Sequence, residues 1–451
     1  MDAPEHCFVY YDDGETQFYV ETITGGTIHE DTSFLEGHLE GHSLAECGPR
    51  DLIPLDNRHV VADILNSWGL ALREAGDPDK AIATLRKAIQ IDPNLVAAHH
   101  NLGNVLGDKD DLDGAIAAYR TAISINPNMA VPHTNLGNAL RRKGDLDGAI
   151  AEHQEALRIN PNHAAAHCNL GNVLRDKREL DEAIAEYRTA ITICPDLAEA
   201  HCGLGRALFV QRDLDGAAVE FRRVIEIKPD SKDSYYDLGV VLDEKGDLEG
   251  AIAAYRQEIR MNPDAVKVYN NLGISLSKKG DFDGAAEVLR KAITLNPNMA
   301  EAHCNLGLVL LKKGDLDAAI EILHTTIRLD PNRAEAHASL GNCLRRKSDL
   351  DGAIAAYRKA VEVRPNFAEP YNNLGTALVD KGDFDGAIAA YRQAIWLKPD
   401  LPAPHSDLAL AFWRKGDYDA AWTQVHRCRA MEFNPPSGFI KQLQQDSGRE
   451  E

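Results

Sequence analysis

The chain has 451 residues, of which 44% are hydrophobic and 26% are charged, and its formal net charge is −21. No stretch approaches the roughly 18 to 20 consecutive apolar residues that a membrane-spanning helix needs, and the first residues lack the basic and then apolar pattern of a secretory signal. The acidic balance argues against nucleic acid and against anionic membrane surfaces as partners, because both attract basic proteins. The eight cysteines are scattered, which is typical of reduced thiols, so we expect a cytoplasmic protein.

Residues 1–61 form an extension that does not follow the pattern of the rest of the chain. Residues 6–11 and 15–23 alternate apolar and polar side chains around Asp12-Asp13-Gly14, which predicts a β-hairpin, and Thr24-Gly25-Gly26 predicts a second turn. A hairpin alone is marginally stable, so we expect it to pack on the helices that follow or to stay partly mobile.

From residue 62 to residue 435 the sequence repeats every 34 residues without an insertion, which makes eleven repeats. Asn-Leu-Gly-Asn, for example, occupies residues 101–104, 135–138 and 169–172. With Ala62 as position 1, position 8 is glycine in the first ten repeats, position 20 is alanine in all eleven, and position 32 is proline in the first ten. A regular period of this length is typical of a solenoid of stacked structural units.

Each repeat predicts two helices joined by a tight turn. Positions 4, 7, 8 and 11 share one stripe of the first helix, and positions 20, 24, 27 and 28 share one stripe of the second. The small residues at positions 8 and 20 let the two helices approach closely. The turn reads Lys-Gly-Asp-Leu-Asp-Gly at residues 143–148, where the glycine suits a left-handed helix end and the next aspartate suits an N-cap. One such pair cannot bury its apolar face alone, so the repeats must stack.

Residues 436–451 close the chain. They predict a short solvating helix over residues 439–445 and then a frayed tail.

The repeats resemble the tetratricopeptide repeat (TPR) family. The second repeat carries the residues that match the family pattern, which are Leu102, Gly103, Leu106, Ala115, Tyr119, Ala122 and Pro127. The array is most similar to long ones such as the targeting region of O-GlcNAc transferase and to bacterial TPR arrays. The resemblance implies an all-α, right-handed α-solenoid superhelix with a concave inner groove. Nothing resembles the transferase catalytic domain, so that activity does not carry over.

Three features depart from the family pattern. Position 4, usually a large aromatic, is mostly histidine, at His99, His133, His167, His201, His303, His337 and His405. Residues 34 apart cannot share a zinc ion, whose ligands lie about 2 Å from one centre, so we expect these histidines to fill packing positions, hydrogen-bonded at one nitrogen. The fifth repeat (198–231) lacks the asparagine pair and carries Gly203, Arg206 and Phe209 instead, which leaves open whether it is a bend or a second site. The last repeat departs as a capping repeat should.

The candidate binding residues are asparagines on the face opposite the buried stripe of the first helix. Positions 2, 6, 9 and 13 lie there, and we expect them to face the groove. An asparagine amide can both donate to and accept from the backbone of an extended ligand; the alternative is that these amides solvate the face or bond neighbouring helices. Nearby arginines would favour a ligand with acidic residues. The candidates are Asn101, Asn104, Asn135, Asn138, Arg141, Arg142, Asn169, Asn172, Arg175, Asn271, Asn305, Asn342 and Asn373.

We find no residues that predict catalysis, a cofactor or a metal site. His38 and His42 stand four residues apart, but the glutamate that must follow the first histidine of a zinc protease motif is missing, so we interpret them as surface residues. The acidic residues at positions 16 and 18 are interpreted as helix caps rather than calcium ligands. Cys168 and Cys202 are too far apart along the array to form a disulfide.

The sequence therefore predicts a non-catalytic scaffold or adaptor that binds extended protein segments in its groove. The alternative is a targeting or regulatory subunit of a separate enzyme, such as a glycosyltransferase or a kinase. Self-association is left open.

Overall fold

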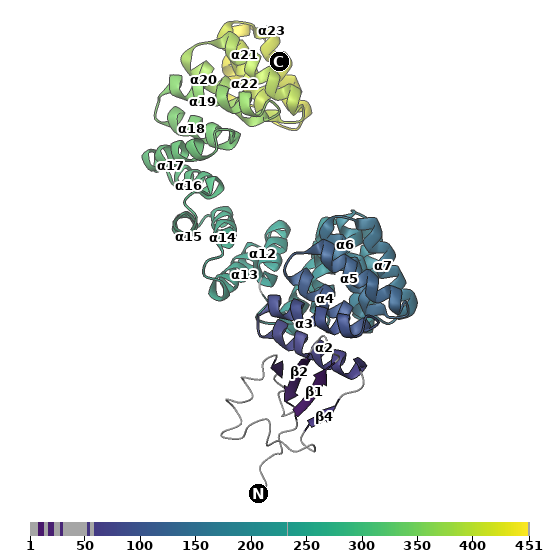
Figure 1. The fold of residues 1–451 in the computed structure, drawn as a ribbon. Coiled ribbons are helices and arrows are strands. Elements are labelled where there is room, and N and C mark those ends of the chain that lie inside the picture. The colour runs from purple at the N-terminus through teal and green to yellow at the C-terminus, as the bar shows by residue number, and fades with distance from the viewer. Residues whose placement is uncertain are drawn as a thin grey trace. The chain divides into compact units, whose positions relative to one another are not determined.

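The computed structural model describes residues 8–12, 17–21, 28–29, 52–54, 58–231 and 233–449 (Figure 1). The chain forms two compact parts, residues 1–229 and residues 230–451, called the N-terminal part and the C-terminal part below. The turn expected at residues 24–26 and the pair His38 and His42 lie outside the described residues.

Each 34-residue repeat forms two antiparallel helices, here called A and B, as the sequence predicts. The A helices are α2 (Arg58–Glu74), α4 (Val96–Asp108), α6 (Ala130–Lys143), α8 (Ala164–Asp176), α10 (Ala198–Val210), α12 (Ser234–Lys245), α14 (Val266–Lys279), α16 (Ala300–Lys313), α18 (Ala334–Arg346), α20 (Ala368–Lys381) and α22 (Pro402–Lys415). The B helices are α3 (Pro78–Ile91), α5 (Leu112–Ile125), α7 (Leu146–Ile159), α9 (Leu180–Ile193), α11 (Leu214–Ile227), α13 (Leu248–Met261), α15 (Phe282–Leu295), α17 (Leu316–Leu329), α19 (Leu350–Val363), α21 (Phe384–Leu397) and α23 (Tyr418–Ala430).

Close approach of the two helices explains the small residues at positions 8 and 20. A Cβ atom placed on Gly103 would lie 2.5 Å from Cε1 of Tyr119, the ring that packs on it from the B helix. Ala115 at position 20 is fully buried in the same repeat. Larger side chains at either position would push the helices apart.

The turn between A and B has the predicted geometry. Gly144 adopts a φ of 88°, and Asp145 Oδ1 accepts a hydrogen bond of 2.9 Å from the backbone N–H of Gly148, which caps α7. The position of Gly144 is occupied in four other repeats by residues for which a left-handed backbone is strained, namely Asp110, Arg178, Arg212 and Ser348, with φ between 63° and 68°.

Stacking places the A helices on the inner side of each part. Within one part, consecutive A helices contact one another, and examples are the pairs α2–α4 and α16–α18, whereas consecutive B helices make no comparable contact within the described residues. Each B helix instead packs on the A helix of the next repeat in the same part. The side of the stack where the A helices crowd together is therefore its inner face.

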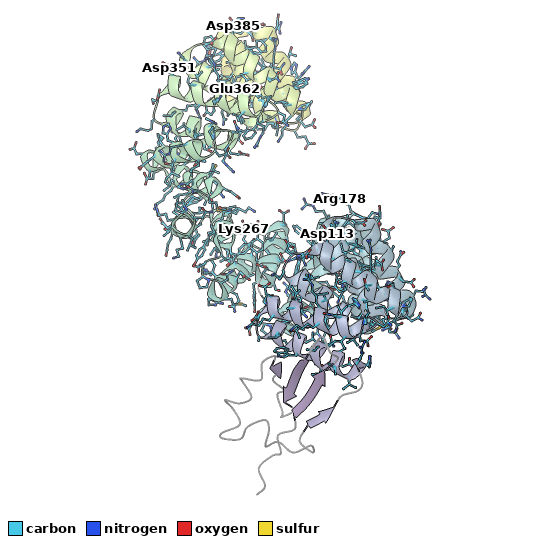
Figure 2. The ribbon with its side chains drawn as sticks, viewed as in Figure 1. Asp113, Arg178, Lys267, Asp351, Glu362 and Asp385 are labelled. Atoms are coloured by element: carbon cyan, nitrogen blue, oxygen red, sulfur yellow. The ribbon has the colours of Figure 1, made fainter. Side chains whose placement is uncertain are left out.

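Ion pairs link successive repeats beside the A–B turns. The lysine at position 14 contacts the acidic residue at position 18 of the preceding repeat. In one such pair, Lys177 Nζ lies 3.0 Å from Asp147 Oδ1. The same pairing joins Lys109–Asp79, Lys143–Asp113, Lys279–Glu249, Lys313–Asp283, Lys347–Asp317, Lys381–Asp351 and Lys415–Asp385. Three of these aspartates, labelled in Figure 2 as Asp113, Asp351 and Asp385, are 79% to 81% exposed. Such exposed pairs contribute little stability each.

A small sheet precedes the first repeat. It contains β1 (Phe8–Asp12), β2 (Gln17–Glu21), β3 (Ile28–His29) and β4 (Leu52–Pro54), in the order β3-β2-β1-β4. β1 and β2 pair antiparallel with Tyr10 opposite Tyr19, which is the hairpin that the alternating pattern predicts. β4 adds in parallel to β1, and its three residues are too few to show an alternating pattern.

The last repeat is covered by α24 (Ser437–Ser447). Leu443 is fully buried, and Phe439 and Ile440 pack on the same apolar cluster, which also contains Phe412 and Trp422. The helix is longer than the predicted residues 439–445, and it buries an apolar face instead of serving only to solvate the end.

Candidate functional site

The asparagines at position 6 bond the preceding A helix. Asn101 Nδ2 donates to Asn66 Oδ1 at 2.8 Å, and the Asn101 side chain is buried, with 8% exposed. Asn135 Nδ2 donates to His100 Nε2 at 2.9 Å and to Asn104 Oδ1 at 3.0 Å. Burial lowers the pKa of His100, so its neutral ring offers the lone pair that this bond needs.

The same link recurs in the C-terminal part. Asn271 Nδ2 donates to Tyr236 OH at 3.3 Å. Asn305 Nδ2 donates to Asn270 Oδ1 at 2.8 Å, and Asn373 Nδ2 donates to Asn342 Oδ1 at 3.1 Å. The alternative that these amides bond neighbouring helices is therefore confirmed for these five asparagines, and their contact with a ligand stays a prediction. The reason is that position 6 lies where consecutive A helices meet, and a polar group at that contact needs a partner. Asn169, also at position 6, makes no side-chain hydrogen bond to the described residues.

The asparagines at position 9 are held by a tyrosine of their own repeat. Tyr119 OH donates to Asn104 Oδ1 at 2.7 Å, and the same pair forms between Tyr187 and Asn172 at 2.9 Å and between Tyr357 and Asn342 at 2.7 Å. Burial raises the pKa of Tyr119 to about 12, so its hydroxyl keeps the proton that it donates.

This bond fixes the amide and leaves one end of it unused. The Oδ1 atom is occupied by the hydroxyl, whereas the Nδ2 atoms of Asn104, Asn172 and Asn342 donate to no residue in the described part of the chain. None of these nitrogens is among the buried atoms that lack a partner. In these three repeats position 9 therefore presents oriented N–H donors on the inner face, and the contact of these amides with a ligand stays a prediction.

The sequence contains a signal for this arrangement that periodicity alone did not reveal. Asparagine occurs at position 9 only in the repeats whose position 24, fifteen residues later, is tyrosine or histidine. Where position 24 is Leu85, Phe221, Leu289, Leu323 or Val425, position 9 is Leu70, Arg206, Ile274, Leu308 or Leu410. Comparing these two positions across the repeats would have identified the tyrosine partners.

The third repeat is the exception. Asn138 stands at position 9, but position 24 is His153, which is fully buried. Neither ring nitrogen of His153 has a hydrogen-bond partner in the described segments. Burial lowers the pKa of His153 to about 4, so the ring is neutral near pH 7. Asn138 makes no side-chain hydrogen bond to the described residues, and both ends of its amide are unused.

The three candidate arginines already contact carboxylates or carbonyls of the protein. Arg141 Nε donates to Asp176 Oδ2 at 2.7 Å, and an Arg175 amino group lies 3.3 Å from the same carboxylate. Arg142 donates to the carbonyl of Gly107 at 2.9 Å and to Asp110 at 2.7 Å. The preference for an acidic ligand stays a prediction, but these arginines offer little uncompensated charge to support it.

Part of the candidate set surrounds a pocket of about 320 Å³ on the inner face of the first three repeats. Its walls include Asn104, Asn135, Asn138 and Arg142 from the predicted set. Its walls also include Arg73, Asp108 and Tyr119, which the asparagine pattern does not predict. The pocket thus gathers four predicted residues from α4 and α6.

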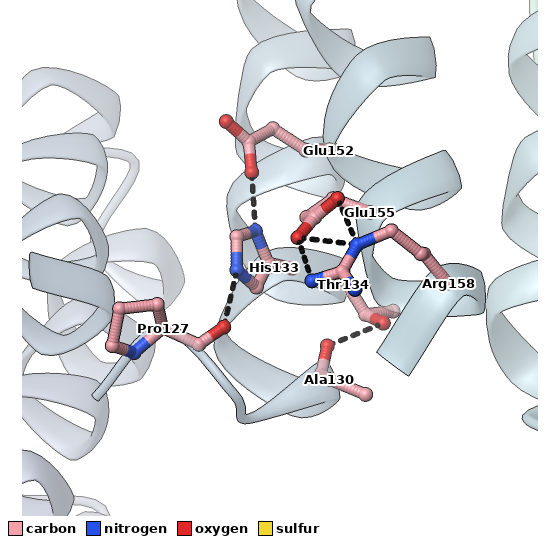
Figure 3. Close-up of polar contacts among 7 residues, drawn as sticks. All are labelled: Pro127, Ala130, His133, Thr134, Glu152, Glu155 and Arg158. Carbon is pink, nitrogen blue, oxygen red and sulfur yellow. Dashed lines mark hydrogen bonds and ion pairs between the residues drawn. The ribbon is translucent and has the colours of Figure 1, made fainter. Parts of the chain in front are cut away.

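The position-4 histidines serve packing, as expected. His133 Nε2 donates to the carbonyl of Pro127 at 3.3 Å, and Nδ1 lies 2.7 Å from Glu152 Oε2 (Figure 3). His99, His303 and His337 use one nitrogen, but His133, His167, His201 and His405 use both. The one-nitrogen expectation is wrong for those four, because their repeats carry Glu or Gln at position 23.

Other features bear on metals, thiols and membranes. No cluster of three or more potential metal ligands occurs within the described residues. The six cysteines in this part of the chain, including Cys168 and Cys202, form no disulfide. At Gly203, where the fifth repeat lacks the asparagine, a Cβ atom would lie 2.4 Å from Cε1 of Tyr187. Among the helices of the described segments, none has the length and apolarity to cross a membrane.

Family models describe the same repeats. Models of the tetratricopeptide repeat match residues 276–343, 202–266 and 236–300, and a TPR repeat model matches residues 69–110, 108–143, 137–177, 171–211, 341–382 and 375–416. A curated relative, the uncharacterized protein ycf37 of Pyropia yezoensis, is 39% identical over 72 residues, which are 16% of this chain and 40% of that protein. The chain therefore spans less than half of that relative.

Several solved structures are similar. MamA is 31% identical over 37% of this chain and 91% of its own, with a TM-score of 0.33. YrrB, described as a TPR protein with an unusual peptide-binding site, is 25% identical over 42% of this chain and 97% of its own, with a TM-score of 0.35. The Cut9–Hcn1 hetero-tetramer is 16% identical over 85% of this chain and 96% of the matched chain, with a TM-score of 0.41.

The family models together span residues 69–416, in the same succession of helix pairs that the structure shows. The chain belongs to the tetratricopeptide repeat family, whose stacked helix pairs are scaffolds for protein–protein interaction.

Proposed function

We propose that the chain is a non-catalytic scaffold that binds extended protein segments along the inner face of its A helices. The observation that carries the proposal is the set of oriented amide donors at position 9. In α4 and α8 the Nδ2 atoms of Asn104 and Asn172 are unused by the described residues, while tyrosine hydroxyls hold the other end of each amide.

An extended peptide offers the complementary groups. Its backbone carbonyls point outward at regular intervals and accept hydrogen bonds whatever the side chains are. Fixing the donor amide before binding also reduces the side-chain entropy lost on binding. The pocket beside Asn104 and Asn138 would accept one ligand side chain, which supplies a first element of selectivity.

The test uses a substitution that removes the donor and keeps the tyrosine bond. In the double variant N104D/N172D, each aspartate oxygen can still accept from Tyr119 or Tyr187, but the Nδ2 donor becomes an acceptor. The matched control is N128D/N162D, which adds the same charge at two exposed turn residues. Peptides selected from a displayed random dodecapeptide library on the wild-type chain are measured by fluorescence anisotropy against all three proteins.

We expect the donor variant to bind at least about tenfold more weakly, since each lost hydrogen bond is worth about 0.5–1.5 kcal/mol. The control variant should match the wild type. Equal binding by the donor variant, or failure of the wild type to select any peptide, would contradict the proposal.

A further inference from the structure

Asp407 is an inner-face carboxylate that has no cationic partner in the described part of the chain. It stands at position 6 of the last repeat, in α22, where six other repeats carry asparagine. Asn372 Nδ2 donates to Asp407 Oδ2 at 3.1 Å. Across the described residues this is the one hydrogen bond of the carboxylate, and it makes no ion pair.

Charged side chains at positions 12 and 13, in the last turn of the A helices, form ion pairs between neighbouring repeats. Arg73 contacts Asp108 at 2.6 Å, and Arg345 contacts Asp380 at 3.4 Å. The pairs Arg141–Asp176 and Lys278–Asp243 are of the same kind. Asp407 departs from this rule, because the neutral amide of Asn372 stands where a cation would compensate it.

The surroundings of Asp407 leave its charge poorly solvated. Burial raises the pKa of the carboxyl group, and the Asn372 bond and the positive charge of Arg345 offset this only in part. Asn372 Oδ1 and Arg345 Nε are themselves buried and have no hydrogen-bond partner among the residues that the structure describes. A partly buried carboxylate in such a place is stabilised by any group that brings positive charge and N–H donors.

We propose that Asp407 binds the cationic side chain, lysine or arginine, of a peptide that lies on the inner face of the last three repeats. This step rests on the function proposed above. Asn342 Nδ2 on the same face is available for a ligand carbonyl, so a backbone contact and a side-chain contact occur in one part of the chain.

A metal ion does not satisfy this site as well as an ammonium or guanidinium group does. Calcium takes six to eight oxygen ligands, and magnesium requires six in near-octahedral order. No group of three potential ligands was found in the part of the chain that the structure covers. An organic cation needs only one carboxylate and carries its own hydrogen-bond donors.

The experiment compares the wild type with Asp407→Asn, whose new side chain stands at the equivalent position of Asn373 in the preceding repeat. The matched control is Asp400→Asn, which removes the same charge from an exposed turn. All three proteins select from the displayed dodecapeptide library. The best wild-type peptides are then resynthesised with norleucine or citrulline in place of each lysine or arginine.

For the wild type and D400N we expect enrichment of lysine or arginine at one peptide position. Replacing it by the neutral analogue should weaken binding about fivefold to tenfold, less so at high salt. D407N should select peptides without this preference and bind the cationic and neutral peptides equally.

A gain-of-function variant completes the test. Asn169 occupies position 6 of the fourth repeat and makes no side-chain bond to the described residues, so Asn169→Asp should create a new preference for a cationic residue without removing a contact. Peptides enriched with no cationic preference, or a preference retained by D407N, would overturn the Asp407 proposal alone. No enrichment of any peptide by the wild type would instead contradict the function on which it rests.

Discussion

His153 and Tyr119 stand at the same position of neighbouring repeats and have opposite consequences for the inner face. The tyrosine hydroxyl donates to Asn104 Oδ1 at 2.7 Å, whereas the two buried nitrogens of His153 form no hydrogen bond with any residue that the structure describes. Unsatisfied buried polar atoms are costly, so the third repeat gives up stability that the second and fourth retain.

Protonation of His153 should make the stability of the third repeat depend on pH. The pKa is lowered from 6.5 in the unfolded chain to about 4 in the fold, so the neutral ring stabilises the repeat above pH 6.5. That stability is lost as the pH falls from 6.5 towards 4, and the full loss is about 3 kcal/mol. Native-state hydrogen exchange of α6 and α7, followed across this range, measures it. An opening free energy that does not change between pH 7 and pH 4.5 would contradict the assignment.

Replacing His153 with tyrosine should stabilise the same repeat. The new hydroxyl can donate to Asn138 Oδ1, as in the neighbouring repeats, and the two unsatisfied nitrogens disappear. We expect the opening free energy of α6 and α7 at pH 7 to rise by about 1–2 kcal/mol, with most of the acid sensitivity lost. In the double variant H153Y/N138A the part of the gain that comes from the hydrogen bond should vanish. A destabilised H153Y would show that the site cannot hold the larger ring.

At the scale of the elements, the A–B turns differ in the residue that occupies their left-handed backbone position. Glycine adopts a positive φ without strain, and other residues do not. Arg178 holds a φ of 68° where Gly144 holds 88°, and it is exposed, so little packing depends on its side chain. Arg178→Gly should stabilise the α8–α9 pair by about 1 kcal/mol, and Gly144→Ala should destabilise α6–α7 by a similar amount. Thermal unfolding and hydrogen exchange measure both. A loss of stability in R178G would mean that the arginine side chain contributes more than the backbone strain costs.

The positions of most helices and turns could be predicted from the sequence, because the 34-residue period specifies where each one begins and ends. Glycine at position 8, alanine at position 20 and the Gly-Asp turn each specify one local geometry, and repetition in register excludes other assignments. The boundary of α24 was harder to predict, since a single amphipathic helix without a repeat has only its own few residues as evidence.

The candidate site was predicted less well, for a physical reason. Periodicity places asparagines on one face, but it does not say whether an amide turns towards solvent or towards the next A helix. Asn101 turns to Asn66 and is buried, whereas Asn104 is held by Tyr119 and keeps a free donor. That choice depends on pairs of side chains 15, 31 or 35 residues apart, which a single-repeat pattern does not contain.

At the scale of the whole molecule, the stacking of repeats means that the stability of each repeat depends mainly on its neighbours. Within each part, a repeat packs on its neighbours in sequence, so a defect at one end of the chain should not reach the other end. Leu443→Ala removes a fully buried side chain from α24 and should cost about 2–4 kcal/mol. Hydrogen exchange should show this loss in α22, α23 and α24 while α2 to α5 are unchanged.

The control for the L443A variant is Leu401→Ala. Leu401 is 41% exposed, so its truncation should change the stability of the last repeat little. Faster exchange in the first two repeats of L443A would contradict local stability and would mean that the array opens as one cooperative unit.

The central claim for the whole molecule is that its inner face binds extended peptide through oriented asparagine donors. The most direct test is a crystal structure of the chain with a peptide selected on it. The account predicts peptide carbonyl oxygens about 2.9 Å from the Nδ2 atoms of Asn104 and Asn172, with both tyrosine bonds intact. A peptide bound on the B helices, or on the inner face with those nitrogens unused, would contradict it.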